Sequence, residues 1–342
     1  MGERTAAELG SAAHGARLPA VGLLAAATLA LAFGALMLGP YALSPADTLS
    51  VLAGGGSEQQ QIVIWNIRLP RIAAAMLVGA GLAAAGASYQ ALFRNPLVSP
   101  DILGVSAGAG LGAVVGIFLS LPVAFIQLSA FAGGLAAVVL VMVVASAIRN
   151  TDRTLSLVLT GVVVGALAGA ATSLLKVMAD PYDQLPAITF WLLGSLASIT
   201  TDDIWPALPA VILGVVPLVL MRWRINVLSL GDEEARALGV EAGRTRFLVI
   251  ACATLATASV TAIAGVVGWV GLVIPHIARM LVGPDFGRLL PVAAMMGAAY
   301  LLGVDTLART MAVIEVPLGI LTAVIGAPFF IWLLASGRRG WS

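Results

Sequence analysis

Long apolar segments separated by short polar ones run along the chain from residue 19 to residue 335. A membrane-spanning helix needs about 20 predominantly apolar residues. The pattern predicts ten spans, at about 19–41, 62–93, two within 102–148, 154–177, 204–221, 246–265, 269–282, 289–311 and 317–335. The apolar stretches are continuous and do not alternate with polar positions, which excludes a β-barrel. We therefore predict an all-α polytopic membrane protein with a single transmembrane domain over residues 1–342.

Prolines, glycines and charges mark the predicted ends of the spans. The segment RNPLVSPD (94–101) contains two prolines, which break helices. The uncharged stretch 102–148 leaves room for two spans with a turn near Pro122, and the mixed segment 178–203 is expected to hold a short helix at 187–197. A second short helix is predicted in SLGDEEARALGVEAGRTR (229–246), with acidic residues from Asp232 at its start and Gly239 as its C-cap.

Composition and charge placement agree with this topology. The chain is 60% hydrophobic and 10% charged, with a mean hydropathy of +1.03, whereas a soluble domain has about 25% charged residues. Ten spans place both termini on one side. That side then carries 14 of the 18 arginine and lysine residues, and the other side only Arg68, Arg71, Lys176 and Arg309. Basic loops stay cytoplasmic, so both termini are predicted to be cytoplasmic.

Glycines recur every four positions in two of the spans. They are Gly104, Gly108, Gly112 and Gly116 in the third span, and Gly161, Gly165 and Gly169 in the fifth. Such stripes let helices approach closely in lipid. They predict a tight bundle, although a stripe of small residues could also line a wide pathway.

The sequence lacks the residue patterns of most catalytic and cofactor sites. Lys176 is the only lysine and follows Leu175, so no phosphate-binding loop of the Gly-Lys-Ser/Thr type exists. His14, His276 and Cys252 give no metal cluster, and no nucleophile–base set is visible. We predict no catalytic residues, no metal, no cofactor bound by this chain and no nucleic-acid partner. Few charges lie at the centre of a span, which argues against an ion-coupled carrier.

Five stretches together resemble one protein family. They are IRLPRIAAAMLVGAGLAAAGASYQALFRNPLVSPDILGVSAGAG (67–110), TFWLLGSLAS (189–198), LGDEEARALGV (230–240), GVVGWVGLVIPHIARMLVG (265–283) and VDTLARTMAVIEVPLGILTAVIGAPFFIWLL (304–334). They resemble the FecCD-type permeases of bacterial ABC importers for iron–siderophore, haem and vitamin B12. The resemblance implies a homodimer in the bacterial inner membrane with the pathway at the dimer interface. It also implies two cytoplasmic ATPase subunits, which use ATP and Mg, and a periplasmic binding protein.

The resemblance assigns roles to three groups of residues. The segment 229–246 matches the coupling helices that contact the ATPase; we expect Gly231, Ala235 and Leu238 to be buried against the ATPase, with Glu234 and Arg236 pairing at the rim. Asn95, Leu97 and Thr154 match the cytoplasmic gate, although Thr154 could equally be a helix N-cap, and Leu155 stands where the family often has a small polar residue. Arg68, Arg71 and Arg309 match positions that receive acidic side chains of the binding protein. The alternatives are a solvated loop at 229–246 and arginines that reach lipid phosphates.

The predicted function is therefore the membrane-spanning permease subunit of an ATP-driven importer. An iron chelate, either haem or a ferric siderophore, is the first choice of substrate, followed by cobalamin or an oxyanion such as molybdate. An ion-coupled secondary transporter that works alone and a structural scaffold that transports nothing are the alternative classes.

Overall fold

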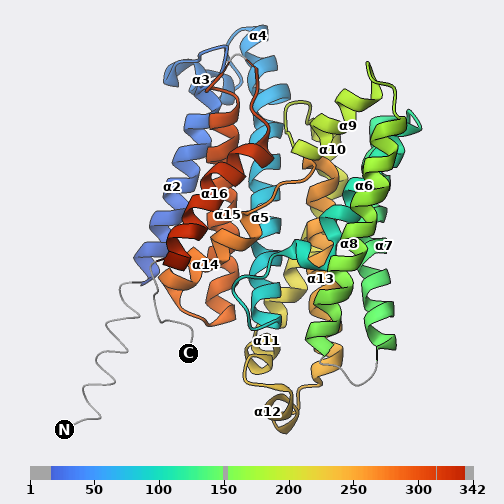
Figure 1. The fold of residues 1–342 in the computed structure, drawn as a ribbon. Coiled ribbons are helices and arrows are strands. Elements are labelled where there is room, and N and C mark those ends of the chain that lie inside the picture. The colour runs from blue at the N-terminus through green and yellow to red at the C-terminus, as the bar shows by residue number, and fades with distance from the viewer. Residues whose placement is uncertain (1–16, 149–152, 313, 336–342) are drawn as a thin grey trace, which may run out of the picture.

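The computed structural model describes residues 17–148, 153–312 and 314–335, and these residues form a bundle of helices (Figure 1). The helices are α2 (Arg17–Met37), α3 (Pro45–Leu52), α4 (Glu58–Gln61), α5 (Leu69–Leu92), α6 (Val105–Phe118), α7 (Val123–Ala147), α8 (Arg153–Met178), α9 (Gln184–Leu193), α10 (Thr201–Leu220), α11 (Arg222–Leu228), α12 (Asp232–Ala237), α13 (Ala242–Ala264), α14 (Val270–Val282), α15 (Phe286–Ala308) and α16 (Leu318–Ala335). The all-α prediction is confirmed.

Among the residues that the structure describes, the number of helices that run along the bundle is near the ten predicted. Six are long and apolar enough to cross a membrane, and α2, α6, α14 and α16 are shorter apolar helices that run alongside them. The longest crossing segment is continuous from Glu58 to Leu92, because a π-helical stretch at Ile62–Arg68 joins α4 to α5. In Figure 1, α3, α4 and α9 lie at one end, named here the α9 end, and α11 and α12 lie at the other, named the α12 end.

Most of the predicted breaks lie where the structure ends its helices. Pro122 is the N-cap of α7, and a 3-10 turn at Pro100–Leu103 begins at the second proline of the segment 94–101. The short helix expected at 187–197 is α9, which begins three residues earlier, at Gln184. The polar segment 42–61 lies between the first two predicted spans. It holds α3 and α4, because Ser44 and Ser57 each form a capping box that satisfies the first backbone amides.

The glycine stripes are contact surfaces between backbones. A Cβ built on Gly112 of α6 would lie 2.0 Å from the carbonyl oxygen of Ser129 on α7, and one on Gly161 of α8 would lie 2.1 Å from that of Ile102. The packing of α5 against α15 is equally close, because a Cβ on Gly79 would lie 2.1 Å from the oxygen of Gly297. The tight-bundle interpretation therefore holds at these positions. Gly169 differs, since a Cβ there meets nothing within 4 Å.

Candidate functional site

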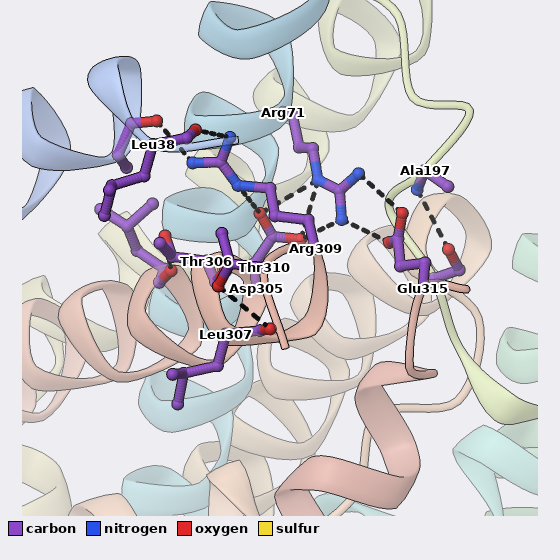
Figure 2. A network of polar contacts seen from close by, with 12 residues as sticks. Leu38, Arg71, Ala197, Asp305, Thr306, Leu307, Arg309, Thr310 and Glu315 are labelled. Carbon is purple, nitrogen blue, oxygen red and sulfur yellow. Dashed lines mark hydrogen bonds and ion pairs between the residues drawn. The ribbon is translucent and has the colours of Figure 1, made fainter. Parts of the chain in front are cut away.

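Arg71 is the centre of a charged cluster at the α9 end (Figure 2). Its Nε donates to both carboxylate oxygens of Asp305, at 2.9 and 3.0 Å, and its Nη2 donates to Asp305 Oδ1 at 2.8 Å. The same guanidinium group also holds Glu315, with 3.0 Å between Nη1 and Oε2 and a second bond from Nη2 to Oε1. The Asp305 side chain is fully buried, whereas that of Glu315 is 27% exposed. Arg71 therefore has one inner and one outer carboxylate partner.

Arg68 and Arg309 bind backbone carbonyl groups where α2 ends. Arg68 donates to the oxygens of Leu36 and Tyr41, and Arg309 to those of Ala35 and Leu38. The last carbonyl groups of a helix have no partner within it and carry the negative end of its dipole, so two guanidinium groups stabilise this end of α2.

Gly39, the second residue after α2, lies directly against both of these guanidinium groups. It has a φ of +147°, and a Cβ built on it would lie 2.9 Å from Arg68 Nη2 and 3.4 Å from Arg309 Nη1. Only glycine therefore fits between the two arginines.

The structure brings the three arginines predicted for docking into one region, but their guanidinium groups bind atoms of their own subunit. Arg68 and Arg71 are 3% and 8% exposed, and the Arg309 side chain is 8% exposed. Their role in docking stays a prediction. Sequence reasoning missed the carboxylates of Asp305 and Glu315. Asp305 could have been found, because it precedes Arg309 by four positions near the end of a span, the spacing of a helical ion pair.

The short helix predicted within 229–246 is α12, at the α12 end, whereas α11 precedes this segment and was not predicted. Gly239 has a φ of +79°, and its backbone amide donates to the carbonyl oxygen of Arg236. The backbone amide of Val240 donates to the carbonyl oxygen of Ala235, so Gly239 forms a glycine C-cap for α12. Arg246 of α13 pairs with Asp232 at 3.0 Å. On α11, the side-chain oxygen of Asn226 accepts a hydrogen bond from the backbone amide of Phe286 at 2.8 Å. Together, α11 and α12 are thus attached to both α13 and α15.

The five residues predicted to contact an ATPase divide between two faces of this segment. Ala235 is 0% exposed and Gly231 is buried, both against their own subunit. Glu234, Arg236 and Leu238 are exposed, with Leu238 at 51%. A partner at this end would therefore meet Glu234, Arg236 and Leu238, and would meet Gly231 and Ala235 only if the segment rearranged.

The residues predicted for the gate lie in the break after α5 and in the first turn of α8. Asn95 and Leu97 are exposed, and Asn95 Oδ1 accepts from the Leu97 amide at 2.9 Å, which fixes this turn. Thr154 is half-buried and stands one residue inside α8, which begins at Arg153. The 3-10 turn that follows Asn95 and Leu97 packs on Gly161 of α8, which lies seven residues beyond Thr154.

Large apolar side chains cover one long face of α8 and another of α16. On α8 they include Val162, Val163 and Leu167, which are 57–64% exposed, and on α16 Val324 and Ile331, which are 63% and 66% exposed. Gly169 opens onto the same free side of α8. These faces must contact either lipid or another protein chain.

Comparisons with known proteins agree with this architecture. A model of the FecCD transport family matches residues 2–336. The cobalamin import system permease protein of Halobacterium salinarum is 45% identical over 85% of this chain and 79% of its own length. A probable iron chelatin transport system permease protein of Helicobacter pylori is 42% identical over 81% of this chain and 83% of its own. A solved inward-facing structure of a metal-chelate type ABC transporter matches with a TM-score of 0.84 and 38% identity, over 92% of this chain and 97% of that one.

Proposed function

The chain belongs to the FecCD transport family, and we propose that it is the membrane-spanning permease subunit of an ATP-binding-cassette importer for a bulky iron chelate, either haem or a ferric siderophore. The proposal is carried by the combination of a bundle of about ten apolar helices, six of them long enough to cross a membrane among the described residues, with a short charged helix, α12, that projects at one end. It places this subunit in a bacterial inner membrane with α12 and both termini on the cytoplasmic side. The excess of basic residues at the α12 end supports that orientation.

Coupling to ATP hydrolysis is proposed to run through α12. Two ATPase subunits would bind ATP and Mg, and each would contact Glu234, Arg236 and Leu238 on one copy of this chain. The anchoring of α11 and α12 to α13 and α15 supports this role, because a push on the exposed face is transmitted to two crossing helices. Ala235 and Gly231 then support the segment from behind.

A second copy of the chain is proposed to complete the pathway. The exposed apolar faces of α8 and α16 and the open position at Gly169 support such a pairing. Asn95, Leu97 and Thr154 would narrow the pathway at the cytoplasmic end.

Docking of the periplasmic binding protein is proposed to involve Arg71 most directly. Its inner partner, Asp305, is sealed from solvent, but its outer partner, Glu315, is partly exposed. A carboxylate of the binding protein could therefore take the place of Glu315 on the same guanidinium group. Arg68 and Arg309 would shape the docking surface through their hold on α2.

A reconstitution experiment tests the choice of an iron chelate over cobalamin or an oxyanion. The permease, its ATPase and its binding protein would be reconstituted in liposomes, and haem, a ferric siderophore, cobalamin and molybdate would be offered in turn. We expect an iron chelate to stimulate ATP hydrolysis and to accumulate inside. Stimulation by cobalamin or molybdate alone would overturn the substrate, and uptake driven by an ion gradient without the ATPase would overturn the whole proposal.

A further inference from the structure

We infer that a groove between α7, α10 and α13 at the α9 end is a binding site for a phospholipid with a primary ammonium headgroup, phosphatidylethanolamine. The groove has a volume of about 520 Å³, which lies in the range of small-molecule sites. Its walls are α7 and α10, and its floor is α13. It is separate from the charged cluster around Arg71 and from α12.

Small residues from each of the three helices leave space for the groove. Ala207 and Ala262 at its base are each 6% exposed, and Ala124 and Ala210 stand on its walls. Larger side chains there would fill the space, as a single added carbon would do at the close helix contacts of Gly79 and Gly112. A long flexible apolar chain of the surrounding bilayer is the natural occupant of such a slot.

The lining changes from polar to apolar along the groove. Asp202 and Asp203 lie in the first turn of α10 and Gln127 in the second turn of α7, both at the α9 end. Phe131 on α7 and Ala210 on α10 lie deeper; Ala210 is eight residues, or about 12 Å, further along its helix than Asp202. The groove thus matches an amphiphile with its polar end outward and its hydrocarbon end toward the membrane centre.

Trp205 indicates the depth of the groove in the membrane. It is 67% exposed on the turn of α10 that follows Asp202, and exposed tryptophan side chains are enriched at the bilayer–water interface. Asp202 is therefore at the level of lipid headgroups. That the leaflet is the outer one rests on the orientation proposed above, whereas the headgroup preference does not.

Charge decides which headgroup the groove accepts. Asp203 is already engaged, because its carboxylate accepts from Gln127 at 2.7 Å and from both the amide and hydroxyl of Thr200 at 2.7 Å. The Asp202 side chain makes no hydrogen bond or ion pair that the structure records among the described residues, and the groove lining contains no arginine or lysine. An ammonium group can pair with the Asp202 carboxylate, whereas an anionic lipid such as phosphatidylglycerol offers only negative and hydroxyl groups to it.

Native mass spectrometry of the full-length permease tests this inference. The protein would be titrated with phosphatidylethanolamine or phosphatidylglycerol of identical acyl chains, and the retained lipid counted. We expect the wild type to favour phosphatidylethanolamine by about fivefold, as for one partly exposed ion pair. Asp202→Asn should bring the ratio close to one. Ala210→Leu should reduce retention of both lipids. If Ala210→Leu folds poorly, Ala124→Leu at the rim should likewise reduce retention of both lipids.

Asp183→Asn is the matched control, because Asp183 is an exposed carboxylate at the same end but does not line the groove. It should leave the ratio at its wild-type value. Equal retention of the two lipids by the wild type would overturn the inference, as would an unchanged ratio in Asp202→Asn. None of these readouts depends on transport, so their failure is distinct from a failure of the proposed function.

Discussion

Arg71 and Asp305, which stand 234 positions apart in the chain, form a two-point ion pair in which the Asp305 side chain has no exposed surface. The pair joins α5 to α15, the two helices that also meet at Gly79 and Gly297. Parallel bonds from a planar guanidinium group to a carboxylate fix orientation as well as distance. The ion pair therefore sets how these two helices face each other at the α9 end.

Removing the inner carboxylate should destabilise the protein. In Asp305→Asn the Arg71 charge loses its buried partner, and breaking one side of a buried ion pair costs about 3–5 kcal/mol. Thermal unfolding of the purified protein in detergent should show a clear drop in Tm, while Glu233→Gln, an exposed carboxylate, should unfold like the wild type. An unchanged Tm in Asp305→Asn would mean that the ion pair contributes nothing to the fold.

Removing the outer carboxylate should instead strengthen docking. Glu315→Gln keeps the Arg71–Asp305 pair and frees the outer side of the guanidinium group, so the affinity for the binding protein should rise severalfold at low salt. The rise should shrink as salt screens the charges. Titration calorimetry measures the affinity and its dependence on salt, with Asp183→Asn as a control for the general loss of a negative charge. Equal affinities in Glu315→Gln and the wild type would remove Arg71 from the docking surface.

The two faces of the α12 segment should respond differently to substitution. Leu238→Glu changes an exposed side chain, so the permease should fold normally but lose transport by about tenfold as contact with the ATPase weakens. Ala235→Arg puts a charged side chain into a fully buried position and should lower the Tm before any coupling can be measured. Uptake assays and unfolding curves on both variants separate these outcomes. Normal uptake by a correctly folded Leu238→Glu would exclude α12 from coupling.

The glycine stripes give a matched pair of substitutions. Gly112→Ala brings a Cβ to 2.0 Å from a backbone oxygen of α7, and such overpacking costs about 1–3 kcal/mol. Gly169→Ala meets open space and should keep or slightly raise stability, because alanine favours a helix. Unfolding of the two variants side by side measures the difference. Equal destabilisation would contradict the helix packing of α6 and α7 described above.

The gate prediction can be tested by crosslinking. Leu97→Cys and Thr154→Cys, each in a Cys252→Ala background, should crosslink between two copies in at least one nucleotide state of the assembled transporter. Asn95 is left intact because its side chain fixes the turn. Leu220→Cys, at the same end on α10, is a control for random collision. Without a crosslink at either position in any state, both residues would lie outside the gate.

The sequence by itself determined the crossing helices of this protein and most of the points where they end. A bilayer leaves no water to satisfy backbone polar groups, so each crossing must be a helix of about 20 apolar residues, and such a run is visible without any tertiary contact. Pro122 and Gly239 act within a few residues of their own positions, so the helix ends that they set could also be predicted from the sequence. The segment 42–61 was the exception, since its two helices are too short for an apolar pattern and depend on the caps at Ser44 and Ser57.

Only the tertiary structure decided which way the functional side chains point. Arg309 stands at the end of α15, and Arg68 and Arg71 lie where the π-helical stretch passes into α5. They turn inward because α2 ends beside them with unpaired carbonyl groups and because Asp305 is brought to Arg71 from 234 positions away. In the same way, Ala235 is buried and Gly169 is open because of the helices packed beside them. The direction of each of these side chains is set by partners that are distant in the chain. Those partners come close only when the helices pack, so the sequence alone does not reveal them.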